Sequence, residues 1–121
     1  MPRPILSEEQ IHPAIRERVG TLHQEIVTEV KLAVANHAVV VVGMALNPMP
    51  KQARAALDAA GVPYKYLEYG NYFNTWRRRN ALKMWTGWPT FPMVFVKGTL
   101  VGGASDVKAL IASGELKRLL A

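Results

Sequence analysis

The densest group of chemically active side chains in this sequence is a cluster of four cations, Arg77, Arg78, Arg79 and Lys83. The cluster contributes to an excess of 15 Lys and Arg over 9 Asp and Glu, a formal net charge of +6. Such a cluster can attract a small anion, a nucleic acid or an acidic protein surface. The solvated basic face of a helix is the alternative interpretation of the same residues.

Cysteine is absent from all 121 residues. Disulfide exchange requires a thiolate, and ligation of an iron–sulfur cluster normally requires one as well. We therefore expect no thiol–disulfide chemistry from this chain acting alone. The three histidines, His12, His23 and His37, lack the spacing of metal ligands, so we also expect no metal site.

The length of 121 residues, half of them hydrophobic, suits one domain with a single core. No run of 18 or more apolar residues is present, so we expect no membrane span. The first ten residues, MPRPILSEEQ, lack the apolar stretch of a signal peptide, and we expect a cytoplasmic protein.

Residues 1–36 predict a helical extension packed on a domain formed by residues 37–121. Pro13 suits the first turn of a short helix that would stop at Gly20. Thr21 and Gln24 have the spacing of a capping box and predict the start of a second helix. That helix would carry an apolar stripe at steps of four residues: Leu22, Ile26, Val30 and Val34.

The rest of the chain alternates between strand and helix patterns, and turn residues separate them. The patterns predict a buried strand at 38–42, a turn with two prolines at 47–50 and a helix at 51–60. A second strand is predicted at 63–68, a basic helix at 71–85 and a hairpin that turns at Gly98 at 93–101. Two closing helices follow, one that starts at Ser105 and one at 114–121. This order predicts one three-layer α/β domain with a small mixed sheet.

This order of elements resembles that of the glutaredoxins from about Ala38 to about Leu119. The most specific piece, WPTFPMVFVKGTLVGG at 88–103, looks like the cis-proline strand and hairpin of monothiol glutaredoxins. The segment KQARAALDAAGVPY at 51–64 is similar to the first helix and second strand of the same family. The resemblance implies a thioredoxin-like fold with a four-stranded mixed sheet.

The same resemblance places Asn47 at the position of the nucleophilic cysteine and Pro50 at the resolving position. Met44 would occupy the position of the lysine that usually precedes the motif in this family. The altered positions argue against disulfide reduction, deglutathionylation and cluster ligation, so we assign no catalytic residue. Asparagine is also among the best N-cap residues of helices, which favours a capping role for Asn47.

The resemblance implies a site for glutathione. Phe91, before a cis Pro92, would pair its backbone with the peptide, and Arg79 would meet the glycyl carboxylate. The helix start after Gly103 would receive the γ-glutamyl end, because helix N-termini offer N–H groups to carboxylates. Ser105 and Asp106 lie at that start, and Asp106 would answer the ammonium group.

Each of these residues also has a structural interpretation. Pro92 could serve only a turn, and Phe91 could belong to the core. Gly103 could permit close packing of the backbone, and Arg79 could be a solvated charge.

Three functions remain open. The first is a redox-inactive regulatory module that binds glutathione, a related γ-glutamyl compound or a protein segment, with glutathione as ligand and not as required cofactor. The second is an enzyme that uses the thiol of bound glutathione, with the Asn47 amide donating to the thiolate. The third is a basic helix that binds a protein or a nucleic acid through interleaved aromatic residues: Tyr72, Phe73, Trp76 and Trp85.

We do not favour nucleic acid as the partner, because aromatic residues at helical spacing are more often packing residues. For the oligomeric state we expect a monomer or a weak homodimer. The apolar stripe of the N-terminal helices could extend the core or form a dimer face.

Overall fold

A four-stranded mixed sheet forms the centre of the protein. The computed structural model describes residues 3–45, 47–70 and 76–121. The strands lie in the order β2-β1-β3-β4, with β1 parallel to β2 and antiparallel to β3, and with β3 antiparallel to β4. Their bounds are Val39–Gly43 (β1), Lys65–Glu68 (β2), Met93–Val96 (β3) and Thr99–Gly102 (β4). The predicted thioredoxin-like sheet is confirmed.

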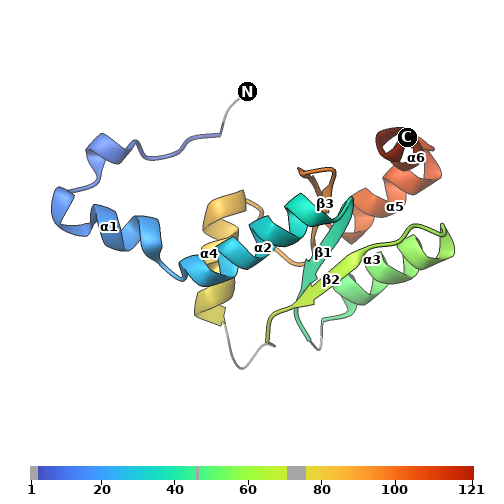
Figure 1. Cartoon of the computed structure of the whole chain (residues 1–121), viewed down its shortest axis with the longest axis horizontal. Coiled ribbons are helices and arrows are strands. Elements are labelled where there is room, and N and C mark those ends of the chain that lie inside the picture. Colours follow the sequence, from blue (N-terminus) through green and yellow to red (C-terminus); the bar gives the residue numbers. More distant parts are fainter. Residues whose placement is uncertain (1–2, 46, 71–75) are drawn as a thin grey trace.

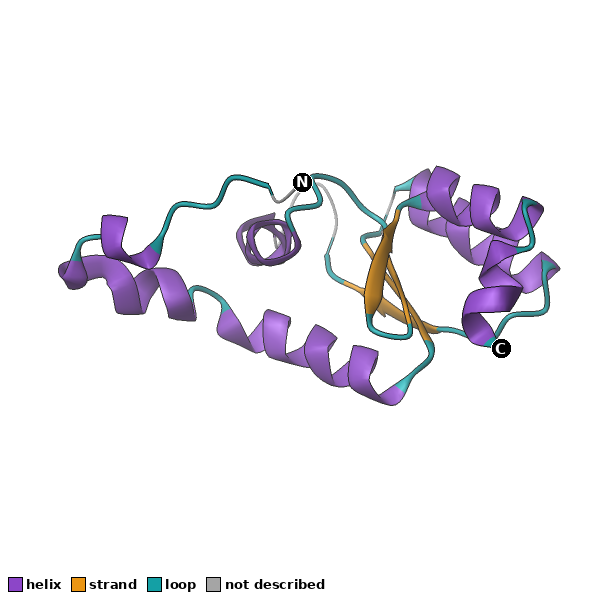
Figure 2. Ribbon diagram, turned by 90° about the horizontal axis from the view of Figure 1, so that it is seen from above, coloured by secondary structure: helices purple, strands orange, loops and turns teal. Residues whose placement is uncertain are grey.

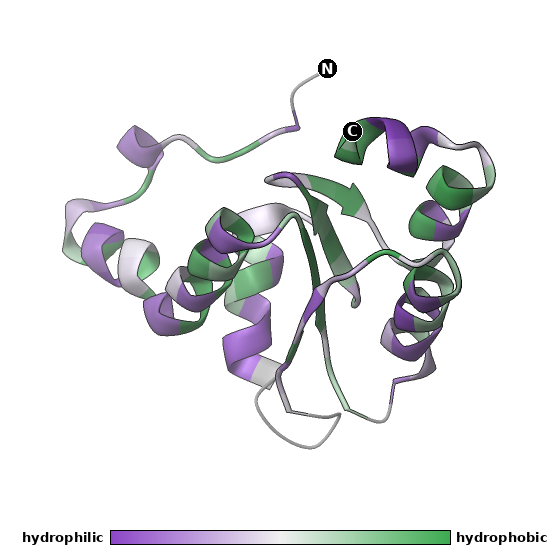
Figure 3. Cartoon of the chain, turned by 45° about the vertical axis from the view of Figure 1, so that its right-hand side comes forward, coloured by the Kyte–Doolittle hydropathy of each residue, from purple (hydrophilic) through white to green (hydrophobic). Residues whose placement is uncertain are grey.

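Helices cover both faces of the sheet and complete three layers (Figure 2). One face is covered by α2 (Gln24–Asn36) and α4 (Trp76–Thr86). The opposite face is covered by α3 (Pro48–Ala59), α5 (Ala104–Ala112) and α6 (Glu115–Leu120). Strands β1 and β3 are mostly hydrophobic, whereas the helices contain both hydrophilic and hydrophobic residues (Figure 3).

Strand β1 joins the two halves of the core, since every one of its residues is buried. Val40 and Val42 belong to a cluster with residues of α2 and α4. Val39 and Val41 belong to a second cluster with residues of α3, α5 and α6. This division follows from the two-residue period of a strand, which sends successive side chains to opposite faces. The prediction of a strand buried on both faces is confirmed.

The two N-terminal helices differ in their packing. Ile26 and Val30 of α2 are fully buried against the sheet and α4. In contrast, α1 (Pro13–Thr21) and the 3₁₀ turn η1 (Glu8–Gln10) contain no buried residue, and α1 lies away from the sheet (Figure 1). The boundary at residue 36 stays a prediction, but the structure places α2 within the core.

The predicted capping box at Thr21 and Gln24 is wrong. The Thr21 hydroxyl donates instead to the Glu17 carbonyl, with 2.7 Å between the oxygens, and α1 continues through Thr21. The residue before α2 is His23, whose φ of 45° and ψ of 42° are left-handed. A left-handed residue ends one helix and redirects the chain before the next, so Leu22 belongs to the link and its side chain is exposed.

The helix after β1 departs from its predicted start, and the predicted start of the basic helix is not tested. The first helix after β1 starts at Pro48, so both prolines lie in its first turn, where backbone N–H groups need no intrahelical acceptor. The basic helix begins at Trp76 in the structure, and the predicted start at 71–75 lies outside the described residues. The hairpin turns at Gly98 as predicted, with Lys97 and Gly98 both left-handed, which matches the twist of paired strands.

We predict that Ile26→Ala lowers the free energy of unfolding by about 2–5 kcal/mol, because it leaves a cavity in a fully buried position. Leu32→Ala on the same helix is the control; its side chain is 59% exposed, and we expect a change within about 0.5 kcal/mol. Chemical denaturation of both variants measures the difference. Equal stabilities would show that α2 is not part of the core.

Candidate functional site

A groove of about 550 Å³ opens at the edge of the sheet where β1 ends and β3 begins. Six of the eight residues that the sequence predicted for the site line this groove: Asn47, Phe91, Pro92, Gly103, Ser105 and Asp106. They come from three separate segments, namely the start of α3, the approach to β3 and the start of α5. The fold therefore brings together residues up to 59 positions apart in the chain, from 47 to 106.

Asn47 forms the first wall of the groove and caps α3. Its side-chain Oδ1 accepts a hydrogen bond from the Met49 N–H at 3.0 Å. This bond confirms the predicted capping role. Pro50, one turn further on, is buried and is not among the described residues that line the groove. A Cβ at Gly43 would lie only 2.7 Å from Cβ of Pro50, so the glycine at the end of β1 permits this approach.

The second wall contains Phe91 and Pro92, whose peptide bond is cis. Phe91 is buried, and the chain enters β3 directly after Pro92. Trp88 also lines the groove; its indole N–H is buried and has no hydrogen-bond partner among the described residues. A Cβ at position 103 would lie 3.5 Å from the Pro92 carbonyl oxygen and 3.8 Å from Nε1 of Trp88. The lack of a side chain at Gly103 thus lets the start of α5 lie close to Pro92 and Trp88.

The third wall is the start of α5. The Gly103 N–H donates to Oδ2 of Asp106 at 2.9 Å, which fixes the carboxylate across the helix start. Gly102 has a φ of +120°, and a Cβ there would lie 2.4 Å from the same Oδ2. Glycine is required at this position both for its conformation and for the space that Asp106 occupies. Ser105 lies in the first turn, where helical N–H groups favour an anion.

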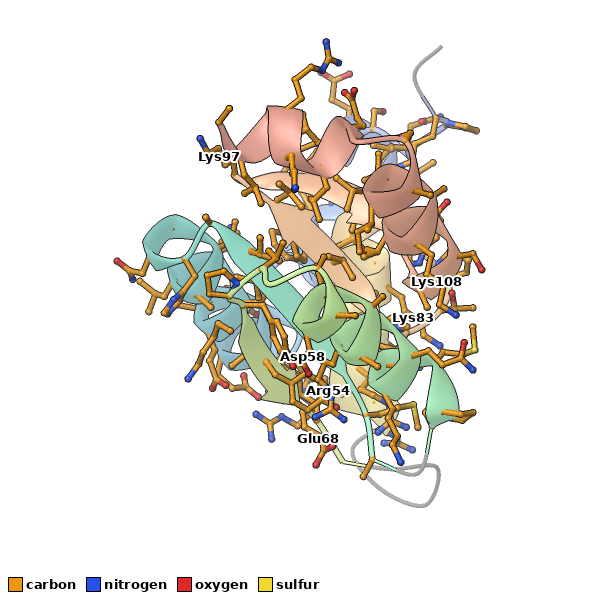
Figure 4. All side chains as sticks on the ribbon, turned by 90° about the vertical axis from the view of Figure 1, so that its right-hand side faces the viewer. Arg54, Asp58, Glu68, Lys83, Lys97 and Lys108 are labelled. Carbon is orange, nitrogen blue, oxygen red and sulfur yellow. The ribbon has the colours of Figure 1, made fainter. Side chains whose placement is uncertain are left out.

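Lys83 is a groove residue that the sequence did not assign to the site. It comes from α4, lines the groove, and holds its Nζ 5.8 Å from the centroid of the Phe91 ring. The sequence had indicated it only as a member of the basic cluster. Its position five residues before Trp88, on the helix that leads into the second wall, was the available signal. Figure 4 labels Lys83.

Arg79 lies elsewhere. Its side chain is only 5% exposed, and Nη1 donates to the Tyr69 carbonyl at 3.0 Å. It is not among the described residues that line the groove, whereas Lys83 is. The groove therefore has a lysine cation towards α4 and the Asp106 carboxylate with the positive end of a helix dipole towards α5.

The aromatic residues of the basic segment have different settings. Tyr72 and Phe73 lie outside the described residues, as does the side chain of Trp76. Trp85 stacks on Phe95, with 6.0 Å between ring centroids and 26° between planes, and packs against the core. Arg78 lies 3.4 Å from Oε1 of Glu25 on α2. Trp85 thus packs α4 on the sheet, and Arg78 links α4 to α2.

Tyr66 of β2 packs on the face of the sheet that α3 covers. Its hydroxyl donates to Glu68 at 3.0 Å, and the Arg54 guanidinium stacks on its ring, with Cζ 4.0 Å from the centroid. Figure 4 shows Arg54 and Glu68 on this side of the molecule. Burial, followed by the hydrogen bond to Glu68, raises the pKa of Tyr66 to about 12.

Tyr69 is a second tyrosine held in its neutral form. It is buried, and its hydroxyl donates to Glu29 at 2.6 Å. Burial and this bond raise its pKa.

The described residues contain no group of three or more His, Asp or Glu side chains arranged to hold a metal ion. No described helix combines the length and the apolar character that crossing a bilayer requires.

Comparison with known proteins agrees with this geometry. The family model described as glutaredoxin matches residues 39–101, which run from the start of β1 into β4. The chain belongs to the glutaredoxin family. It is a glutaredoxin-like protein without cysteine, in which Asn47 caps a helix at the position that the resemblance aligns with the family's nucleophile.

Individual relatives share most of the fold. A glutaredoxin-like protein of Dictyostelium discoideum is 45% identical over 81% of this chain and 80% of its own length. A glutaredoxin of Ricinus communis is 33% identical over 77% of this chain and 91% of its own length. The crystal structure of oxidized glutaredoxin 2 from Chlamydomonas reinhardtii has a TM-score of 0.70 at 30% identity, covering 81% of this chain and 92% of that one.

We predict that Asn47→Ala lowers the free energy of unfolding by about 1 kcal/mol, because it removes the acceptor for the Met49 N–H. Asn47→Asp keeps an acceptor of similar geometry, and we expect it to retain the stability of the parent. Urea denaturation measures both variants. A loss with aspartate as large as that with alanine would contradict the capping role.

We predict that stability falls as the pH rises from 10 to about 12. In this range the unfolded chain releases the Tyr66 proton, whose ordinary pKa is 10.0, whereas the folded chain retains it. Folding therefore takes up a proton, which costs stability with increasing pH. Denaturation at several pH values should show a shallower fall for Tyr66→Phe, with Tyr69 still contributing. Identical slopes for the variant and the parent would contradict the raised pKa.

Proposed function

We propose that this cysteine-less member of the glutaredoxin family is a redox-inactive module that binds glutathione or a related γ-glutamyl peptide in the groove. The observation that carries the proposal is the groove itself. It is lined by the cis Pro92, by Gly103 and by the Asp106 carboxylate at the start of α5. Asn47 lies where the resemblance places the nucleophile. A binding or regulatory role fits a site of this shape without a thiolate.

The charges of the groove suit a peptide with ionic groups at both ends. Lys83 offers an ammonium group to a carboxylate, and the first turn of α5 offers N–H groups to another. Asp106 offers a carboxylate to an amino group, although one of its oxygens already accepts from Gly103. Glutathione carries two carboxylates and one ammonium group, so its ends match this arrangement.

The backbone beside Pro92 suits the middle of such a ligand. An extended peptide pairs with exposed main-chain groups and gains affinity from them. The structure of a buckwheat glutaredoxin–glutathione complex has a TM-score of 0.68 to this chain at 22% identity, which shows a shared fold. This likeness is consistent with a peptide-sized ligand in the groove, and the charges of the groove favour one with ionic ends.

The test is titration with reduced glutathione and with S-methylglutathione, followed by calorimetry and by the amide signals of Phe91, Ser105 and Asp106. We expect saturable, millimolar binding of both compounds, because the proposed site holds the peptide and does not use its thiol. Lys83→Gln should weaken binding about tenfold, since it removes one charged contact worth roughly 1.5 kcal/mol. Lys65→Gln, an exposed lysine on β2, is the matched control and should leave affinity unchanged.

Two results would overturn the proposal. The first is an absence of amide shifts in the groove at millimolar concentrations of both compounds. The second is binding of reduced glutathione alone, because this outcome would assign a role to the thiol and favour the glutathione-dependent enzyme.

A further inference from the structure

One wall of the groove has no part in the binding proposed so far. The ionic ends of the ligand are assigned to Lys83 and to the start of α5, and its backbone to the chain beside Pro92. The first wall, where β1 ends and α3 begins, contributes Met44, Asn47 and Met49 to the lining. A peptide held along Pro92 between the two charged ends leaves this wall for the side chain of its middle residue. In glutathione that side chain carries the sulfur atom.

The side chains of the first wall are mostly apolar. Met44 is buried, and Met49 is 37% exposed although it is a large apolar residue. Methionine is flexible and fills irregular apolar spaces, so the two side chains can adapt to partners of different shape. Among the described residues, this wall contributes no ionisable side chain to the groove. An apolar group placed against it would remove Met49 from water, which favours binding.

The backbone of the first wall offers little to an anion. A thiolate is usually stabilised by a neighbouring cation or by free N–H groups at the start of a helix. The first three residues of α3 are Pro48, Met49 and Pro50. The two prolines have no N–H group, and the Met49 N–H donates to Oδ1 of Asn47 at 3.0 Å. None of these three residues therefore has an N–H group to donate to a sulfur anion.

We propose that the groove prefers thioether conjugates of glutathione, in which the sulfur carries an apolar substituent, to free glutathione. A thioether sulfur has no proton to lose, so it requires neither a cation nor a free N–H group. Its substituent would lie against Met44 and Met49, and the burial of apolar surface would add affinity. This inference rests on the proposed function, because Lys83 and the start of α5 must still hold the ends of the peptide.

The test is calorimetry with reduced glutathione, S-methylglutathione and S-hexylglutathione. The two conjugates differ only in the length of the apolar substituent. We expect the hexyl compound to bind at least about tenfold more tightly than the methyl compound, since each methylene group that is fully buried adds about fourfold. Reduced glutathione should bind no more tightly than S-methylglutathione.

Variants assign the preference to the first wall. Met49→Gln keeps a side chain of similar length but makes it polar, and we expect the ratio of the hexyl to the methyl affinity to fall at least about threefold. Met84→Gln is the matched control, because Met84 is 55% exposed on α4 and is not among the described residues that line the groove. It should leave the ratio unchanged. Unaltered amide signals from the sheet show that each variant is folded.

Lys83→Gln separates this inference from the proposed function. It should weaken both conjugates by the same factor and leave their ratio unchanged, because Lys83 is assigned to an ionic end of the peptide. Absence of binding by all three compounds would overturn the proposed function and the inference with it. Equal affinities for the three compounds would leave the proposed function standing and overturn the preference for conjugates. A ratio that falls equally in Met49→Gln and Met84→Gln would also overturn it.

Discussion

Burial of β1 on both faces is the constraint on which the rest of the structure depends. Its four valines divide between two core clusters, so the strand holds the α2–α4 layer and the α3–α5–α6 layer to a single sheet. The strand also pairs with β2 and β3, which satisfies its backbone without water. Because β1 is fixed in this way, the position at which it ends decides where the chain turns into α3.

The groove follows from that endpoint. Gly43 ends β1 without a side chain, Pro50 packs into the space, and the first turn of α3 begins at the edge of the sheet. The antiparallel partner β3 starts at the same edge, immediately after the cis peptide at Pro92. The hairpin to β4 then returns the chain to α5. All three walls are thus consequences of where the strands begin and end, and none of them requires a thiol.

Asn47 has a structural role at the position that the resemblance aligns with the family's nucleophile. The start of a helix needs an acceptor for its first N–H groups, and asparagine supplies it. The N-terminal arm presents the reverse situation, because α1 is a regular helix that the core does not stabilise. The two ends of the molecule therefore differ: packing and capping hold the elements around the groove, whereas no residue of α1 is buried.

Much of the fold could be predicted from local patterns. The valine run of β1, the proline entry to α3 and the Lys97–Gly98 turn each reflect short-range physics, namely side-chain alternation, a missing N–H group and backbone twist. The capping box at Thr21 could not be judged in the same way. Whether a threonine caps the next helix or bonds back to its own depends on where the chain turns, and the left-handed His23 decides that.

The sequence by itself determined the family and the lack of a cysteine side chain, because a motif in order and a missing residue type can be read without coordinates. Only the tertiary structure decided which cation reaches the groove. Arg79 and Lys83 are four residues apart on one helix, yet Arg79 is buried against the Tyr69 carbonyl and Lys83 faces Phe91. Their roles differ because the packing of α4 on the sheet sets the direction of each side chain, and that packing depends on residues far away in the chain.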